Sequence, residues 1–505
     1  MRALLLLLLI INYTIASAQP ANSKWIEGLL EFDFNKSPLI SSHFGETSTF
    51  PGWHGHSNIS DSNGNILIFC NGFYLYNVFG KLIENDEYFL PKKQVNFFGP
   101  QDPYNQRSLI LPKKNNQYYL FVWGSTDSCF EKSIQVNQYI PDMLAYSIVD
   151  MKLNNGFGKV ISNLNFVING DSLSSSQMSA VRHANGNDWW LIKPKLSSNI
   201  YHVVYVSSDS VWEKNIQQVD IPDSKVNGRI GQSNFSLDGS LYGIVAFPSA
   251  QNGKIRILKF DRCSGILTKY KTIPIPLDTI KYFDTNLGID TFYLLPIGNG
   301  ICFSPNNKFV YISGKYEVWQ YDMDADEIIN IRSENDTIIN PCEYTNMYNS
   351  IDGRIYVGYS AGNCQTLTYI ENPNLKGKAC NLCQNCFSKP SDPLHYTCAP
   401  PNMPNYSLGA LKGSPCDTIG KLQNQTMVVY PNPASNYLQV YFPQAMNSNV
   451  ELALYDMLGQ RVYSWNKTLN SKQEVVLSLP KLSVGLYTLQ AEVNGDKYVA
   501  KVLIE

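Results

Sequence analysis

The chain has 505 residues, and its 40 Lys and Arg residues nearly balance its 42 Asp and Glu residues. A formal net charge of -2 gives no electrostatic reason to expect a nucleic acid or an anionic membrane as partner. The length exceeds what one hydrophobic core usually serves, so we expect two domains of unequal size. Charged residues make up 16% of the chain and aromatic residues 12%, a balance that favours strands. We therefore expect an all-β protein.

The N-terminus has the three parts of a signal peptide. A basic start at Arg2 is followed by an apolar run over residues 3–11 and by the small residues Ala16, Ser17 and Ala18. Residues 1–18 are thus the expected signal peptide, with cleavage between Ala18 and Gln19. The apolar run is short, and no other stretch approaches the ~20 residues that a membrane helix needs, so we expect a soluble mature protein without a transmembrane segment.

Between residues 25 and 412 one pattern recurs, in which a tight polar turn joins two apolar strands. The turns are rich in Asp, Asn and Gly, which favour hairpins. Their spacing of about forty to beyond fifty residues is that of four-stranded propeller blades with loop insertions. The clearest turns are 61–64, 77–80, 183–188, 237–239, 305–307 and 352–353. We predict a β-propeller over residues 19–412.

Several segments resemble a propeller type common among secreted bacterial proteins. They read NISDSNGNILIFCNG, YSIVDMKLNNGFGKV, AVRHANGNDWWLI, LKFDRCSGIL, GICFSPNNKFVYIS and CAPPNMPNYSLG. The resemblance implies six to seven blades, the seventh closed partly by the first mature strand around residues 25–34. Only a short linker, 413–427, follows, so the propeller must carry whatever function exists.

Eleven cysteines lie in a chain that we expect to be exported, where disulfides form readily. Cys380, Cys383 and Cys386 have C-x-x-C spacings that suit a metal, with Cys398 or His395 as a fourth ligand. Because exported thiols tend to oxidise, we favour disulfides among these four cysteines over a metal site. We expect no cofactor.

The remaining chemical patterns are weak. Ser360 sits in a G-x-S-x-G sequence, but a strand is expected after it, so the strand-to-helix elbow of a hydrolase is missing. Asp322, Asp324 and Asp326 alternate like the start of a calcium loop without its glycine or its twelfth carboxylate. His54 and His56 flank a glycine, and we expect them to line a loop. No catalytic residue is predicted.

The last 78 residues, 428–505, alternate apolar and polar side chains as half-buried strands do. Pro431 and Pro433 place a turn before the first strand. The turn at residues 456–460 and the Asn494-Gly495 pair then join further strands as hairpins. We predict a small β-sandwich of the immunoglobulin-like kind.

Three parts of this segment, VYPNPASNYLQV, LYDMLGQRV and LSVGLYTLQAEVNGDKYVAKVLIE, occur in the order and place that define a known module. They resemble the type A C-terminal sorting domain of type IX secretion substrates. The resemblance implies the type IX translocon and a sortase as partners, removal of the module after transport, and a protein that is released or attached to the outer-membrane surface.

Three classes of function remain open from the sequence. A binding or adhesion propeller for an extracellular protein or glycan needs only shape, aromatic residues and loops, which are abundant. A secreted hydrolase or lyase needs acids, bases or metal ligands that converge in the central funnel. A structural component of the cell envelope differs from the first class only in its partner. We favour the binding module, since no catalytic set is visible.

Overall fold

In the computed structural model the chain divides into two compact units, residues 1–183 with 187–409 and residues 184–186 with 410–505. The limits 19–412, 413–427 and 428–505 expected from the sequence remain proposals. The structure describes residues 21–28, 30–44, 55–85, 89–98, 104–196, 199–220, 231–246, 254–274, 278–280, 292–294, 300–314, 317–332, 343–359, 366–388, 399–417, 427–442, 449–469, 474–493 and 496–505.

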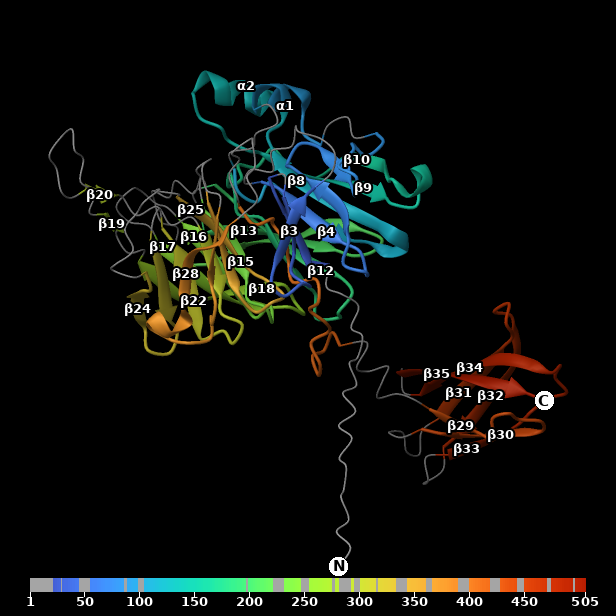
Figure 1. The fold of residues 1–505 in the computed structure, drawn as a ribbon. Coiled ribbons are helices and arrows are strands. Elements are labelled where there is room, and N and C mark those ends of the chain that lie inside the picture. The colour runs from blue at the N-terminus through green and yellow to red at the C-terminus, as the bar shows by residue number, and fades with distance from the viewer. Residues whose placement is uncertain are drawn as a thin grey trace, which may run out of the picture. The chain divides into compact units, whose positions relative to one another are not determined.

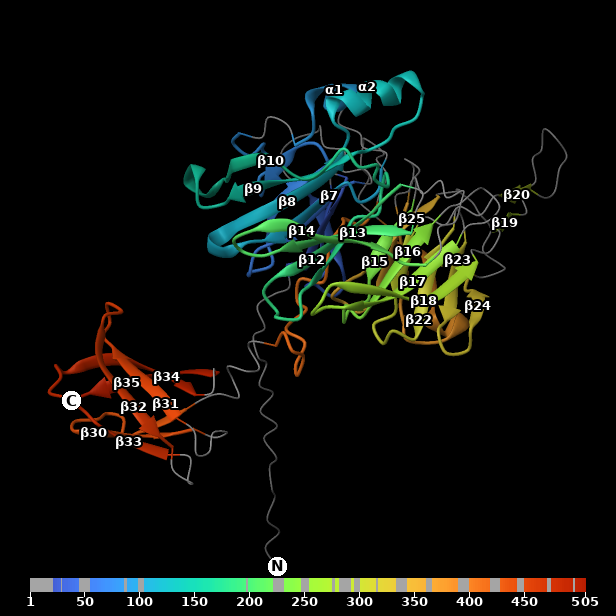
Figure 2. The same cartoon turned by 180° about the vertical axis from the view of Figure 1, so that it is seen from behind.

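The first unit consists of antiparallel sheets, each built from consecutive strands (Figures 1 and 2). The first two sheets have three strands each: β1 (Lys24–Glu27), β2 (Leu30–Asp33) and β3 (Ile40–His43), then β4 (Ser57–Ser60), β5 (Ile66–Cys70) and β6 (Leu75–Asn77). The next two have four strands each: β7 (Ser108–Pro112), β8 (Gln117–Gly124), β9 (Met143–Asp150) and β10 (Lys159–Asn169), then β11 (Ser179–Arg182), β12 (Trp189–Pro194), β13 (Ile200–Val206) and β14 (Val211–Gln218).

Three further four-stranded sheets complete the set, with a separate hairpin of β19 (Asp278–Ile280) and β20 (Phe292–Leu294) between them. The strands are β15 (Ser233–Phe235), β16 (Leu241–Ala246), β17 (Lys254–Asp261) and β18 (Ile266–Pro274); β21 (Gly300–Phe303), β22 (Phe309–Ser313), β23 (Val318–Asp322) and β24 (Glu327–Asn330); and β25 (Tyr344–Asn349), β26 (Ile355–Tyr359), β27 (Thr366–Ile370) and β28 (Leu382–Ser388).

The sheets follow one another as blades of a β-propeller. The first strands of successive sheets lie side by side: β4 beside β7, β11 beside β15, β15 beside β21, and β21 beside β25. The ring closes where the first sheet meets the last, because the rings of Trp25 and Tyr356 lie 5.6 Å apart and those of Phe32 and Phe387 lie 6.0 Å apart. Within the described residues, seven sheets of three or four strands thus form the ring.

The closure differs from the expectation that the first mature strand completes the last blade. Residues 24–43 instead form a sheet of their own, in which β2 pairs with both β1 and β3. The last sheet already has four strands from residues 344–388. The first and last sheets therefore meet through packed aromatic side chains, and we call this junction the seam.

The predicted polar turns are confirmed as hairpin turns. The Asp61 carboxylate accepts hydrogen bonds from the backbone N–H groups of Asn63 and Asn65, both at 2.9 Å, between β4 and β5. Gly239, between β15 and β16, has φ of 73°, a conformation that strains any residue with a Cβ. Local turn chemistry thus sets the blade hairpins.

Two short helices were not expected from the sequence. α1 (Lys92–Phe98) precedes β7, and α2 (Asp127–Gln135) lies between β8 and β9. The side chain of Thr126 caps α2 by accepting a hydrogen bond from the backbone N–H of Cys129. Both views show the helices side by side at one end of the propeller (Figures 1 and 2). In the described part of the chain, no helix is long and apolar enough to cross a membrane.

The second unit contains two antiparallel sheets around one core. One sheet has the order β29 (Val428–Tyr430), β30 (Tyr437–Tyr441), β33 (Glu474–Ser478); the other has β32 (Arg461–Thr468), β31 (Asn449–Tyr455), β34 (Gly485–Val493), β35 (Asp496–Ile504). Leu438 and Leu477 from the first sheet and Leu452 and Leu489 from the second belong to the same buried cluster. The predicted β-sandwich is confirmed, whereas its immunoglobulin-like character stays a prediction.

The order of strands differs in one detail from the expectation. The short strand β29 precedes Pro431 and Pro433, so the proline turn follows the first strand of the sandwich. The two hairpins are as predicted, because β31 pairs with β32 across residues 456–460 and β34 pairs with β35 through Val493 and Asp496. The residues Asn494 and Gly495 themselves lie outside the described part.

Candidate functional site

The centre of the propeller is filled by a buried amide, Asn402, which is 2% exposed. Its Nδ2 donates to the carbonyl oxygens of Ser108 at 2.9 Å and Met178 at 3.0 Å. Its Oδ1 accepts from the hydroxyl of Tyr348 at 2.9 Å and from Nε2 of Gln106 at 3.2 Å. Ser108 belongs to β7 and Tyr348 to β25, and Met178 directly precedes β11, so Asn402 links three blades. We call Asn402 and these four partners the axial network.

Two glutamines extend the polar links between blades. Nε2 of Gln106 also donates to the carbonyl oxygen of Ser233, on a fourth blade, that of β15, at 2.8 Å. Gln232 accepts from the backbone N–H of Ile301 at 3.0 Å and donates to the carbonyl oxygen of Met347 at 2.8 Å. Both glutamine side chains are fully buried. Amides suit this place because one side chain can satisfy both carbonyl and N–H groups of neighbouring strands.

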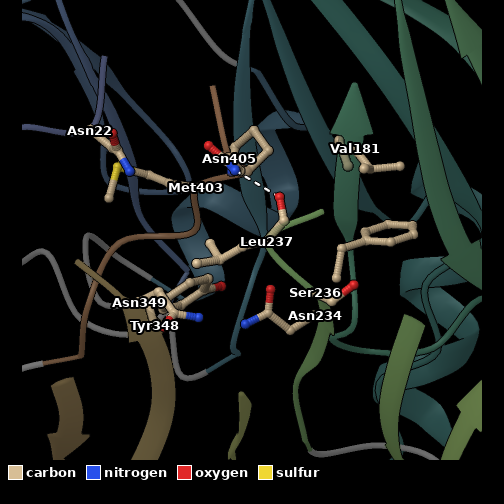
Figure 3. Close-up of a pocket in the computed structure, with 12 residues that line it drawn as sticks. Asn22, Val181, Asn234, Ser236, Leu237, Tyr348, Asn349, Met403 and Asn405 are labelled. Carbon is tan, nitrogen blue, oxygen red and sulfur yellow. Dashed lines mark hydrogen bonds between the residues drawn. The ribbon is translucent and has the colours of Figure 1, made fainter. Parts of the chain in front are cut away.

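A small recess opens beside the axial network, with a volume of about 40 Å³. Figure 3 shows Asn22, Tyr348, Met403 and Asn405 around it, and Asn405 donates to the carbonyl oxygen of Leu237 at 2.8 Å. The described residues that line the recess include amides, hydroxyls and apolar groups, without a carboxylate or a histidine. Such a space holds little more than a water molecule. A funnel site with convergent acids and bases therefore has no counterpart among the described lining residues.

A larger open recess lies at the seam, with a volume of about 720 Å³. We call it the seam groove. On one side runs the turn between β2 and β3, residues 34–39, and on the other side lie residues of β26, β27 and β28, of the turn before β26 and of the end of β27. These are Asp352, Arg354, Tyr356, Tyr369, Glu371, Cys386 and Phe387. A recess of this size is in the range of ligand sites.

Arg354 is the central polar group of the seam groove. Its Nη2 donates to Oε1 of Glu371 at 3.4 Å, and its Nη1 lies 3.7 Å from Oδ2 of Asp352. Its guanidinium carbon lies 4.5 Å from the ring centroid of Tyr369, a cation–π contact. Burial disfavours the charge, but Tyr356, Tyr369 and Asp352 outweigh that effect and raise the pKa of Arg354. The side chain is still 32% exposed, so the groove presents a fixed, accessible cation.

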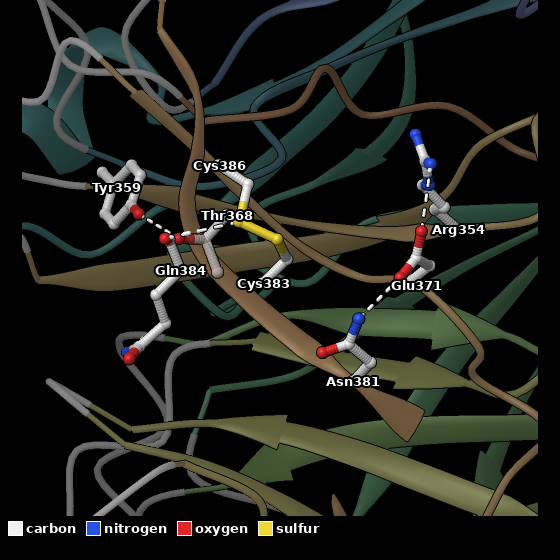
Figure 4. Close-up of a disulfide and its surroundings, with 8 residues drawn as sticks. All are labelled: Arg354, Tyr359, Thr368, Glu371, Asn381, Cys383, Gln384 and Cys386. Atoms are coloured by element: carbon white, nitrogen blue, oxygen red, sulfur yellow. Dashed lines mark hydrogen bonds and ion pairs between the residues drawn. A yellow bond between two sulfur atoms is a disulfide. The ribbon is translucent and has the colours of Figure 1, made fainter. Parts of the chain in front are cut away.

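The two carboxylates beside Arg354 are held in place in turn. Asp352 accepts from the hydroxyl of Tyr356 at 2.8 Å and from the backbone N–H of Arg354 at 3.1 Å. Glu371 accepts at Oε2 from Nδ2 of Asn381 at 2.6 Å (Figure 4). Arg354, Asp352 and Glu371 thus each have more than one contact, and these contacts fix the orientation of their side chains.

The cysteines beside the groove form one disulfide, Cys383–Cys386, with Cα atoms 5.6 Å apart on β28 (Figure 4). Cys380, which we expected in a disulfide, is instead a free buried thiol that packs with Tyr311. Burial raises its pKa to about 11. Cys398, the fourth candidate, lies outside the described residues. Among the residues that the structure describes, no three His, Cys, Asp or Glu side chains gather as a metal site would require.

The disulfide should make a modest contribution to stability, because it closes a very short loop. The Cys383→Ser, Cys386→Ser double variant should lower the free energy of unfolding by about 1–2 kcal/mol. Because Cys263 and Cys416 are also disulfide-bonded, dithiothreitol should lower the melting temperature of the native chain at least as much as the double substitution does, whereas EDTA should leave it unchanged. A fall in melting temperature on chelation alone would instead indicate a metal at these cysteines.

The other singled-out residues do not converge. His56 is fully buried, and its carbonyl oxygen accepts from the backbone N–H of Asn402, so it belongs to the centre of the fold. Asp322 forms an ion pair with Lys376 at 3.0 Å, and Asp326 with Lys271 at 3.1 Å, so these two calcium-loop candidates have separate partners. Ala18, Gln19, His54, Ser360 and His395 lie outside the described residues.

The second unit contains the part of the chain that matches a known family. Residues 428–505 match the model of the secretion system C-terminal sorting domain. These residues are a sorting domain of the type IX secretion system. The match begins at the residue predicted from the sequence and ends at the last residue of the chain. The sorting domain indicates export and placement at the cell surface or outside the cell.

Solved structures whose chains follow a similar path share little sequence identity with this chain. They include a protein from Lactobacillus plantarum (11% identity, 75% of this chain and 89% of that chain, TM-score 0.33) and the periplasmic gluconolactonase PpgL of Pseudomonas aeruginosa (11%, 74% and 89%, 0.31). A third is Hsv2 of Kluyvelomyces marxianus (9%, 68% and 85%, 0.34). No curated protein matches the chain by sequence. The fold assignment therefore rests on the sheets of this structure.

Proposed function

We propose that the chain is an exported binding module, in which the propeller binds an extracellular ligand in the seam groove. The type IX translocon and a sortase are the partners of the sorting domain, and Ala18–Gln19 is the signal cleavage site. The mature propeller then acts outside the cell or attached to the outer-membrane surface.

The observation that carries this proposal is the contrast between the centre and the seam. At the centre, the described amides of Asn402, Gln106 and Gln232 bond to one another or to the backbone of neighbouring strands. At the seam, a guanidinium and two carboxylates are held by their neighbours and remain partly accessible. Fixed polar groups in an open recess favour binding, because little conformational entropy is lost when a ligand arrives.

The experiment is a retention assay with the purified full chain and its Arg354→Ala variant. Immobilised protein is exposed to protein and polysaccharide fractions from the medium and cell surface of the producing bacterium. Loss of one charged hydrogen-bond donor costs about 1.5–3 kcal/mol, so binding should weaken at least about tenfold in the variant.

Lys376→Ala is the matched control. Lys376 is also a cation between two carboxylates, at 3.0 Å from Asp322 and 2.9 Å from Glu327, but it lies outside the seam groove. Its removal should leave retention unchanged. Equal retention by wild type and Arg354→Ala for every bound component would contradict a binding role for the groove.

A further inference from the structure

We propose that the ligand of the seam groove is a neutral glycan, recognised through a pair of neighbouring hydroxyl groups at Arg354 and Glu371. This inference rests on the proposed binding function and names the chemistry of the ligand. Three features of the groove carry it: its charge balance, its arrangement of donors and acceptors, and its aromatic wall.

The charges that line the groove cancel. Lys36 and Arg354 are opposed by Asp352 and Glu371, and both carboxylates already lie within ion-pair distance of Arg354. An anionic ligand would meet these two carboxylates, and a cationic ligand would have to compete with Arg354 for them. Because like charges in contact cost binding energy, the balance favours a ligand without net charge.

Hydrogen-bond donors of Arg354 and acceptors of Glu371 lie next to each other in the seam groove. Of the five N–H groups of the guanidinium, one donates to Glu371 at 3.4 Å, and Tyr356 also lies within hydrogen-bonding reach, which leaves other N–H groups for a ligand. The Glu371 carboxylate accepts one bond at each oxygen, from Arg354 and from Asn381, which leaves further lone pairs. A hydroxyl group both donates and accepts, so two adjacent hydroxyls can accept from Arg354 and donate to Glu371 at once.

An aromatic surface adjoins this polar pair. The Tyr369 ring supports the guanidinium and is partly exposed, whereas Tyr356, whose ring lies 5.5 Å from it, is 1% exposed and contributes no open surface. Phe387 also lines the groove and is only partly buried. A sugar ring presents C–H groups on its face and hydroxyls on its edge, so it can pack on the aromatic wall while its edge meets the polar pair. A neutral glycan therefore satisfies both sides of the groove.

The test is isothermal titration of the purified full chain with three probe sets. The first contains neutral oligosaccharides of glucose, mannose, xylose and N-acetylglucosamine, the second contains oligogalacturonates, and the third is a peptide pool from the surface proteins of the producing bacterium. We expect binding within the neutral set and a dissociation constant at least tenfold higher for Arg354→Ala. Arg354→Lys, which keeps the charge but loses the planar fork, should weaken binding as well.

The outcomes separate this inference from the proposed function. Lys376→Ala should bind like wild type, and melting temperatures show that each variant is folded. Arg354-dependent binding of the peptide pool or of oligogalacturonates, without binding of neutral sugars, would overturn the glycan inference and leave the binding module standing. An absence of Arg354-dependent binding in all three sets would overturn both.

Discussion

Replacing Asn402 by alanine should lower the free energy of unfolding of the propeller by about 3 kcal/mol. The substitution removes two donors and one acceptor oxygen from a site that is 2% exposed. The carbonyl oxygens of Ser108 and Met178 then lose the donor on Asn402, and the hydroxyl of Tyr348 loses the acceptor of its proton, although it still accepts from Gln106. Each buried polar group left without a partner costs about 1–3 kcal/mol, and partial relaxation keeps the sum near the lower end.

Denaturation by guanidinium chloride, followed by tryptophan fluorescence, measures this effect. Asn215→Ala is the matched control, since Asn215 is exposed on β14 and accepts a bond from the nearby Gln217. The control should unfold at the same denaturant concentration as wild type. If Asn402→Ala also does so, the axial network does not hold the blades together.

Replacing Trp25 by alanine should cost about 4 kcal/mol, the largest effect that we expect from one residue. Trp25 is fully buried at the seam, with its ring 4.5 Å from that of Phe34 and 5.6 Å from that of Tyr356. Truncation of a buried tryptophan to alanine typically costs about 3–5 kcal/mol, because packing is lost and a cavity remains. Since no strand pairing joins the first and last described sheets, the seam depends on this packing.

The seam prediction is checked by the same unfolding experiment. Trp212→Ala serves as control, because Trp212 is 43% exposed on β14 and packs mainly on Tyr205. Its loss should cost about 1 kcal/mol or less. Limited proteolysis should cut Trp25→Ala first within residues 21–44, where the first sheet would detach. Equal stability of the two tryptophan variants would show that the ring closes by other means.

Features set by neighbouring residues could be predicted from the sequence. The Asp61 turn and the Gly239 turn depend on a side chain two residues away or on one permissive backbone position, and both are found in the structure. The sorting domain is contained in 78 contiguous residues, and β31, β33 and β34 alternate buried with less buried side chains. In this domain the alternation of apolar and polar residues and the turn residues predict the same strands and hairpins.

Features that join distant parts of the chain could not be predicted. Asn402 stands in the segment CAPPNMPNYSLG, whose resemblance to propeller sequences gives Asn402 no role, and its partners lie about 50 to 300 residues away. In the seam groove, Arg354 and Tyr356 alternate along the chain as residues of one strand face do, but Glu371 and the turn at 34–39 come from elsewhere. The helix α1 has only seven residues, too few for an apolar period to stand out.

We expect residues 428–505 to direct export of the propeller, and the localisation of a truncated chain measures this role. The full chain and a chain that ends at residue 427 are expressed in a bacterium that has an outer membrane and a type IX secretion system. Antibodies to the propeller quantify each chain in the periplasm, at the cell surface and in the medium. The full chain should reach the surface or medium, while the truncated chain should accumulate in the periplasm. Export of the truncated chain at the level of the full chain would show that residues 428–505 do not direct export.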